Sequence, residues 1–223
     1  MKAARAAELL GATELFSSFA PETLARLGER ALERRYKRGQ LIFSQGDSGD
    51  ALLVVTEGLV KVFVTSDEGD EMVLITLRPP DSFGELALID GGPRSASAQA
   101  LEPTSALAVT RDDVRALIRE HPQLADSLLA SLGALVRRLT EQAADLVFLD
   151  LHGRVAKLLV QLAREGNVLD LNLTQSDLAA MVGGSRQSVN QILQAFQRRG
   201  YLDLEGRRIT LKRLDALSRR GGL

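Results

Sequence analysis

The spacing of apolar side chains changes twice along the 223 residues of the chain. Between residues 8 and 34 the spacing is helical and predicts short helices; the apolar positions are Leu10, Leu15, Phe16, Phe19, Leu24, Leu27 and Leu32. From Lys37 short apolar runs alternate with turn signals such as Gln45-Gly46-Asp47. Many short strands with such turns are typical of an antiparallel sandwich or barrel, so we expect a β-roll of roughly 90 residues. The predicted strands are Leu41–Phe43, Leu52–Val55, Leu59–Val64, Met72–Leu77 and Ala106–Val109.

The helical period returns at Arg111, first in a short helix around Asp112–Arg119 and then in a long one. The long helix carries an approximate apolar stripe that lasts about three heptads; its positions are Leu124, Leu128, Leu132, Leu135, Leu139, Gln142 or Ala143, and Leu146. Such a stripe can pack on its own domain, or it can form a parallel dimer. Its length and its position between two domains favour the dimer. Asp150 is expected to cap a following helix, Gly153–Arg164, with Phe148-Leu149-Asp150 as the hinge.

The stretch from Thr174 to Tyr201 has the spacing of a helix-turn-helix. The inward positions predicted for its two helices are Leu178, Val182, Val189, Ile192, Leu193 and Phe196. Gly183 would supply the positive φ that the turn needs, and Ser185 would cap the second helix. The outward side chains of that helix can read base edges in a major groove; they are Arg186, Gln187, Asn190 and Gln191. The alternative is an ordinary helical hairpin.

Two short apolar runs after this motif flank Glu205-Gly206-Arg207 and predict a two-stranded wing. Arg207 and Arg208 would lie at its tip, where arginine side chains can contact phosphate beside the groove.

Composition is that of a soluble globular protein, with 45% hydrophobic and 26% charged residues. The absence of cysteine excludes disulfides, cysteine-ligated iron–sulfur clusters and thiol switches. The two histidines, His121 and His152, stand far apart without a carboxylate pattern, so we expect no metal site. No apolar run approaches the roughly 18 residues of a membrane span, and no signal-peptide core is present, so we expect a cytoplasmic protein.

Charge is divided unevenly along the chain. Residues 151–223 hold 12 Lys and Arg against 6 Asp and Glu, a net charge of +6. Residues 1–150 hold 16 Lys and Arg against 23 Asp and Glu, a net charge of −7. A basic C-terminal module on an acidic body suits phosphate binding by one domain, although a solvated basic surface would have the same counts.

Three motifs, in this order and spacing, resemble those of the bacterial Crp/Fnr family of transcription regulators, named for the cyclic AMP receptor protein and the fumarate-nitrate reduction regulator. They are Phe83-Gly84-Glu85-Leu86 with Arg94-Ser95-Ala96; Phe148-Leu149-Asp150 with Gly153-Arg154-Val155-Ala156; and Leu173-Thr174 with Ser185-Arg186 and Val189. The resemblance covers about Leu15 to Leu211 and is closer to the cyclic-nucleotide-binding branch. It implies an α+β fold with a β-roll in residues 1–120, a dimerisation helix and hinge in 121–149, and a winged helix-turn-helix in 150–223.

The segment from Phe83 to Ser95 resembles the cassette that holds a cyclic nucleotide inside the roll in this family. The resemblance assigns ligand binding to Gly84, Glu85, Leu86, Arg94 and Ser95. Arg94 can donate to an anionic phosphate in fork geometry, Ser95 adds a hydroxyl, and Glu85 can accept from a ribose hydroxyl. Alternatively, Arg94 and Glu85 only pair with each other.

Two departures from the family pattern count against the assignment of cyclic AMP as the effector. Responsive members place two adjacent hydroxyl residues on the long helix, and here the positions are Leu139 and Thr140, so Thr140 is the remaining ligand candidate. Leu139 removes a possible donor to adenine, which should weaken adenine discrimination or allosteric coupling. Pro80 replaces a glycine that usually precedes the Asp81 turn.

The recognition helix of the family commonly carries a glutamate and an arginine where this chain has Gln187 and Gln191. Arg186 keeps the bidentate donor for guanine, so we expect a half-site with one retained G·C pair and a relaxed neighbour. Four further residues are placed like phosphate contacts: Thr174, Ser185, Ser188 and Arg207.

The sequence therefore predicts a homodimeric regulator that binds a palindromic operator in double-stranded DNA, meets RNA polymerase and is controlled by cyclic AMP. The alternatives are a regulator of the same build that answers to another small effector or binds DNA constitutively, and a nucleotide-binding module of a partner enzyme. No nucleophile–base arrangement is apparent, so no catalytic residue is expected.

Overall fold

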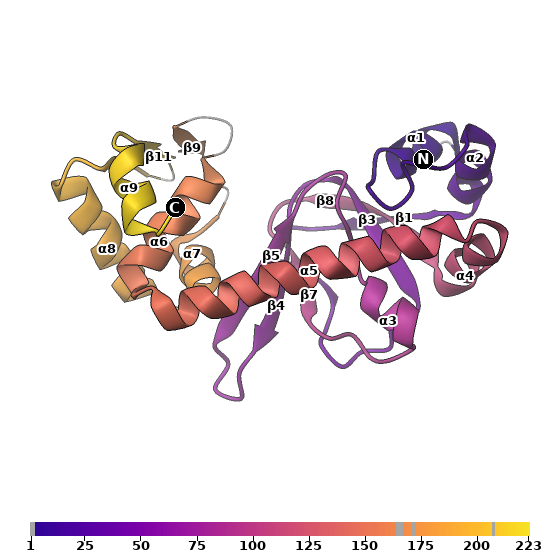
Figure 1. Cartoon of the computed structure of the whole chain (residues 1–223), viewed down its shortest axis with the longest axis horizontal. Coiled ribbons are helices and arrows are strands. Elements are labelled where there is room, and N and C mark those ends of the chain that lie inside the picture. The colour runs from indigo at the N-terminus through magenta and orange to yellow at the C-terminus, as the bar shows by residue number, and fades with distance from the viewer. Residues whose placement is uncertain (1–2, 164–166, 171–172, 207) are drawn as a thin grey trace. The chain divides into compact units, whose positions relative to one another are not determined.

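The computed structural model describes residues 3–163, 167–170, 173–206 and 208–223 (Figure 1). The chain forms two compact units, residues 1–64 with 75–137, and residues 65–74 with 138–223. The long helix α5 (Gln123–Phe148) contributes residues to both units. No helix in these described ranges is long and apolar enough to cross a membrane.

The β-roll is built on two antiparallel sheets, in the strand orders β1-β8-β3-β6 and β2-β7-β4-β5, and lies in the first unit except for the end of β4 and the start of β5. The strands are β1 (Leu32–Tyr36), β2 (Leu41–Phe43), β3 (Ala51–Glu57), β4 (Val60–Thr65), β5 (Glu71–Leu77), β6 (Ser82–Phe83), β7 (Ser97–Ala100) and β8 (Thr104–Thr110). The helices of the first unit, besides the start of α5, are α1 (Ala3–Gly11), α2 (Pro21–Arg30), α3 (Glu85–Asp90) and α4 (Arg111–Glu120). The predicted β-roll is therefore confirmed, and all five predicted strands are present.

Strand β3 separates two hydrophobic cores. Leu53 and Val55 face the core inside the roll, where Phe83 also lies. Leu52 and Val54 face a second core, which packs against the N-terminal segment, α4 and the start of α5. Successive strand residues point to opposite faces, so every residue from Ala51 to Val55 is buried. This explains why β3 has a continuous apolar run instead of an alternating one.

The prediction that Leu32 belongs to a helix is wrong. Helix α2 ends at Arg30, and Leu32 begins β1, where it pairs with Ala108 and is 58% exposed. Leu15, Phe16 and Phe19 are buried, but in turns between α1 and α2 rather than in a helix. The pattern also gave no sign of β1, β6 and β7, whose short or polar sequences lack period-two alternation.

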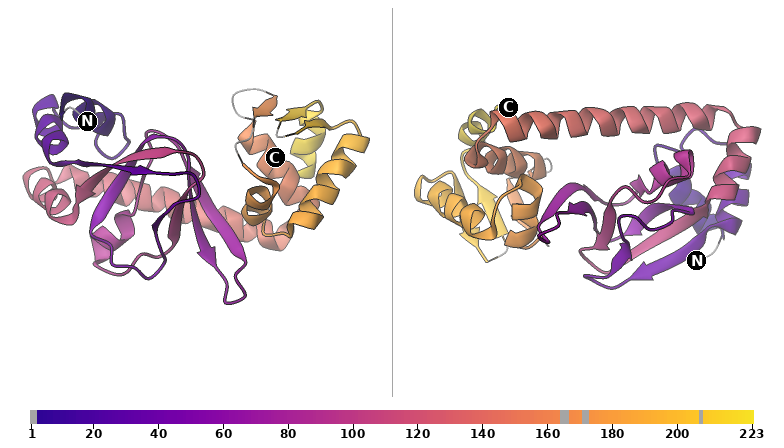
Figure 2. Two further views of the ribbon diagram at one scale, coloured as in Figure 1. Left: turned by 180° about the vertical axis from the view of Figure 1, so that it is seen from behind. Right: turned by 90° about the horizontal axis from the view of Figure 1, so that it is seen from below.

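The second unit contains helices α6 (Leu151–Leu162), α7 (Gln175–Val182), α8 (Arg186–Arg198) and α9 (Leu214–Arg220). The predicted wing is present as β10 (Leu202–Glu205) and β11 (Arg208–Leu211). Strand β9 (Val168–Asp170), which was not predicted, pairs with β11 and extends the wing to three strands. Figure 2 shows these helices grouped beside the small sheet.

Helix α5 is buried only at its start. Leu124 and Leu128 are 1% and 6% exposed and belong to the second core of the first unit. Farther along, the apolar side chains of Val136, Leu139 and Leu146 are 61%, 38% and 43% exposed. The first turns of the stripe thus pack on their own domain, whereas the later ones leave apolar surface open to a partner.

Asp150 caps α6 as predicted, because its Oδ1 accepts from the backbone N–H of Gly153 at 2.8 Å. The helix begins at Leu151, two residues before the predicted start. An N-cap side chain accepts from the backbone N–H of the second or third helical residue, and Gly153 is the third. The same carboxylate forms an ion pair with Arg220 of α9. The Gly153 hydrogen bond, and then Arg220, lower the pKa of Asp150.

We expect Asp150→Ala to lower the free energy of unfolding by about 1 kcal/mol, the usual cost of losing a helix cap. Asp150→Asn should lose less at neutral pH because an amide oxygen still accepts from Gly153. A carboxylate with a lowered folded-state pKa stabilises the fold above its unfolded pKa, and acidification removes that stabilisation. The advantage of wild type over Asp150→Asn should therefore shrink as the pH falls through the lowered pKa. Urea denaturation at several pH values measures the free energy of unfolding of each protein. Equal losses of this free energy in Asp150→Ala and Asp150→Asn would refute the capping role.

Candidate functional site

The cassette predicted between Phe83 and Ser95 is a tight strand-turn-helix. Strand β6 leads into Gly84, which has φ +86° and precedes α3. A Cβ at this position would lie 2.4 Å from Nη1 of Arg94. Gly84 is therefore required both by its backbone conformation and by the close approach of the arginine.

Arg94 lies under this turn and is only 6% exposed. Its Nη1 donates to the carbonyl of Gly84 and its Nη2 to the carbonyl of Ala51, both at 2.9 Å. The guanidinium carbon is 4.3 Å from the centroid of the Phe43 ring. Burial lowers the pKa of Arg94, and the charge of Asp50 opposes that shift.

The alternative in which Arg94 and Glu85 only pair with each other is not realised, because both guanidinium hydrogen bonds go to backbone carbonyls. Within the described part of the chain, Nε of Arg94 is buried and has no hydrogen-bond partner. Burial raises the pKa of Glu85, opposed by its own backbone N–H and by the charge of Arg94. Leu86 is half-buried, while Ser95 is exposed.

Arg111 is a cassette residue that sequence reasoning missed. Its Nη2 donates to the carbonyls of Gly49, at 2.5 Å, and Ala87, at 2.6 Å. It therefore joins α3 to the loop before β3. Gly49 has no room for a side chain, since a Cβ there would lie 2.2 Å from the Cβ of Ala87. Only the position of Arg111, directly after an apolar strand, could have drawn attention to it.

The remaining ligand candidate, Thr140, lies on α5 in the second unit and is exposed, next to the 38% exposed Leu139. Gln142, two residues on, donates from Nε2 to the carbonyl of Leu74 at 2.8 Å.

The helix-turn-helix is formed by α7 and α8, and its predicted inward residues are all buried. A capping box starts α7, because the Thr174 hydroxyl accepts from the N–H of Asp177 while the Asp177 carboxylate accepts from that of Thr174. Gly183 has φ +63°, as the predicted turn requires. The Ser185 hydroxyl accepts from the N–H of Ser188 at 3.1 Å and caps α8.

The outward face of α8 carries Arg186, Gln187 and Gln191 as exposed side chains. Asn190, predicted beside them, is half-buried, and its Oδ1 accepts from Nε2 of Gln175 at 3.3 Å. Gln175 was not singled out from the sequence, although its place directly after the Thr174 cap puts it on the first turn of α7.

Three of the four predicted phosphate contacts have hydroxyls near helix N-termini. Thr174 and Ser185 are the N-caps of α7 and α8, and Ser188 shares a 2.8 Å hydrogen bond with Ser185. The fourth, Arg207, lies outside the described residues. Among the described residues there is no cluster of three His, Cys, Asp or Glu side chains that could hold a metal ion.

Comparisons with known proteins cover nearly the whole chain. Residues 33–121 match the cyclic nucleotide-binding domain and residues 153–220 match the Crp-like helix-turn-helix domain. A CRP-like cAMP-activated global transcriptional regulator from Mycobacterium tuberculosis is 36% identical over 220 residues, which cover 96% of this chain and 98% of the relative. The cyclic AMP receptor protein of Thermus thermophilus is 39% identical over 190 residues, covering 85% and 88%.

Among solved structures, the catabolite activator protein of Thermus thermophilus is 36% identical, with a TM-score of 0.55 over 94% of this chain and 98% of that one. These relatives are transcription regulators, not enzymes. The chain therefore belongs to the Crp/Fnr family of DNA-binding transcription regulators and carries a cyclic nucleotide-binding domain of that family.

Proposed function

We propose that this chain is a homodimeric transcription regulator whose DNA binding is controlled by cyclic AMP in the β-roll. The observation that carries the effector site is the buried guanidinium of Arg94. It has an unpartnered Nε and no hydrogen bond to a carboxylate among the described residues. A buried cation without a hydrogen-bonded anion is costly, and a cyclic phosphate would supply both a further negative charge and the acceptor.

The other cassette residues suit the rest of such a ligand. Ser95 is exposed and offers a hydroxyl beside Arg94 in the chain. Glu85, whose pKa burial raises, can accept from a ribose hydroxyl once charged. Gly84 allows the close approach of Arg94 beneath the turn, and Leu86 would add apolar contact to the ligand. The names of the relatives from M. tuberculosis and T. thermophilus describe those proteins as cAMP-activated and as a cyclic AMP receptor.

DNA recognition is assigned to the start of α8. Arg186 is exposed on its first turn, and it can donate two hydrogen bonds to O6 and N7 of guanine. Gln187 and Gln191 lie on the same face, and amides favour adenine or discriminate weakly. Asn190, held by Gln175, would contact a base only from its remaining NH₂ group.

Thr174, Ser185, Ser188 and Arg207 are proposed as phosphate contacts, which position the protein without reading sequence. The exposed apolar residues in the second half of α5 support a dimer, and a two-fold dimer would read a palindromic operator. RNA polymerase is the proposed further partner of the DNA-bound dimer.

Isothermal titration of the full chain with cyclic AMP tests the effector site. We expect micromolar binding that Arg94→Ala weakens at least tenfold, because a charge-assisted hydrogen bond is lost. Arg94→Ala can also loosen the fold, so Ser95→Ala provides an exposed second variant with an expected loss of about fivefold. Thermal unfolding checks the integrity of each variant. Full binding by both variants, or no binding by wild type, would contradict the site and favour another effector or constitutive DNA binding.

The departure at Leu139 generates a separate expectation. Leu139→Thr restores a hydroxyl beside Thr140 and should raise selectivity for cyclic AMP over cyclic GMP by about fivefold, the value of one hydrogen bond. Leu139→Val, which removes volume without adding a hydroxyl, is the matched control. Equal selectivity of the two variants would show that this position does not meet the base.

For DNA, Arg186→Ala should cost about 1–3 kcal/mol of operator affinity and relax specificity at one base pair. Arg198→Ala removes the same charge at the other end of α8 and is the control, with specificity expected to remain intact. Ser188→Ala should weaken binding to all sequences alike. Fluorescence anisotropy with an operator selected from random DNA measures all three. The docking would be wrong if Arg186→Ala and Arg198→Ala had the same specificity profile.

A further inference from the structure

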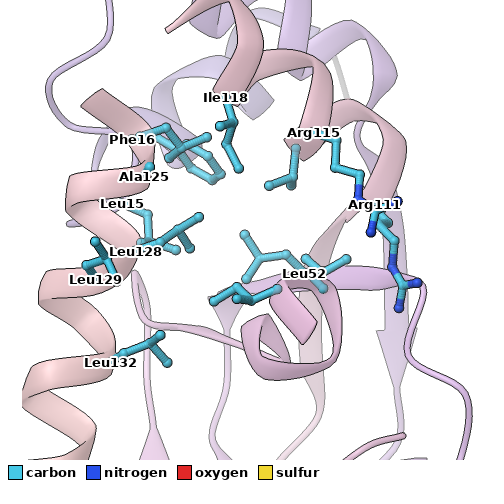
Figure 3. Close-up of a pocket in the computed structure, with 14 residues that line it drawn as sticks. Leu15, Phe16, Leu52, Arg111, Arg115, Ile118, Ala125, Leu128, Leu129 and Leu132 are labelled. Carbon is cyan, nitrogen blue, oxygen red and sulfur yellow. The ribbon is translucent and has the colours of Figure 1, made fainter. Parts of the chain in front are cut away.

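A cavity of about 310 Å³ lies in the first unit, between the outer face of β3 and helices α3, α4 and α5. Figure 3 shows apolar side chains from separate segments directed towards this space, among them Phe16, Leu52, Ile118 and Leu128. Small-molecule sites commonly have volumes of 300–1,000 Å³ and mostly apolar walls, with a few polar groups that fix the ligand.

The cavity is not the nucleotide cassette. Leu52 lines it, whereas the next residue of β3, Leu53, faces the roll interior with Phe83. Since consecutive strand residues point to opposite faces, β3 separates the two spaces. Arg94 and Ser95 do not line the cavity.

One side of the cavity is cationic. Arg111 and Arg115 lie together there in Figure 3, and none of the described residues that line the cavity is Asp or Glu. Arg115 is exposed, and in the described ranges no carboxylate forms an ion pair with it. Arg111 keeps a buried Nε without a hydrogen-bond partner among the described residues. An apolar body with two guanidinium groups at one side matches an amphiphile with an anionic head.

We propose that this cavity binds a medium-chain carboxylate, with its chain among the leucines and its carboxylate at Arg115. A volume of about 310 Å³ is at the lower end of the range for small-molecule sites, which favours an alkyl chain of medium length. The carboxylate stays at the edge, where the exposed Arg115 offers a fork of N–H donors. Short-chain carboxylates bury too little apolar surface to displace the solvent.

Titration of the full chain with decanoate, below its micellar concentration and without nucleotide or DNA, tests the proposal. Because neither nucleotide nor DNA is present, failure to bind decanoate would not count against the proposed regulatory function, and failure of that function would not count against this site. We expect one decanoate per protomer with a micromolar Kd, and no comparable binding of decyltrimethylammonium, which has the same chain and the opposite charge.

Two variants test the binding of the alkyl chain and of the carboxylate separately. Ala125→Phe places a ring in the cavity from α5 and should abolish binding, while its melting temperature should hold or rise because an apolar void is filled. Arg115→Gln should weaken binding about tenfold. Arg119→Gln, an exposed arginine one turn further along α4 that does not line the cavity, should leave binding unchanged.

Three results would overturn the proposal: no saturable binding, equal binding of decanoate and decyltrimethylammonium, or undiminished binding by Ala125→Phe. Sedimentation velocity at the same concentrations supplies one further outcome. If decanoate bound only as the protein dissociated into protomers, a second copy would be the occupant of the cavity, and the carboxylate assignment would be wrong.

Discussion

Two guanidinium groups fix the cassette in this protein, that of the buried Arg94 and that of the half-buried Arg111. Arg94 bonds the carbonyls of Gly84 and Ala51, and Arg111 bonds those of Gly49 and Ala87. Together they hold a loop, a strand and the short helix α3, which has few hydrogen bonds of its own. Side chains that bond backbone carbonyls in this way replace the ladder contacts that irregular segments lack. The glycines at positions 49 and 84 follow from the same arrangement, because any side chain there would collide with Ala87 or Arg94.

The helix-turn-helix depends on a different kind of local constraint. Each of its helices begins with a hydroxyl that satisfies a free backbone N–H, Thr174 for α7 and Ser185 for α8. The hydroxyls proposed to contact phosphate therefore already have structural roles. The Thr174 hydroxyl already donates its proton to the Asp177 carboxylate at 2.7 Å. Ser185 and Ser188 share one hydrogen bond, so one of these two hydroxyls keeps a proton that it can donate outward. Structural and recognition roles can thus coincide in one residue.

Local rules of sequence predicted much of this molecule. The N-caps Asp150 and Ser185 and the positive φ of Gly183 each depend on a few neighbouring residues, and all are found where expected. The strand character of Leu32 was missed because it depends on pairing with Ala108, far away in the chain. Arg111 and Gln175 were missed for the same reason, since their partners are assembled only by the fold. Periodicity also could not divide the stripe of α5 into its buried start and its exposed remainder, because both halves have the same spacing.

The continuous helix α5 determines what an insertion or deletion in this part of the chain would do. Its 26 residues rise about 1.5 Å each without interruption, and both compact units contain part of it. One inserted residue would turn everything after it by about 100° around the helix axis. An insertion of seven residues would nearly restore the original phase, with a residual turn of about 20°. The effect of an insertion in α5 therefore depends on its length relative to the helical repeat, whereas an insertion in a loop of the roll is not bound to that repeat.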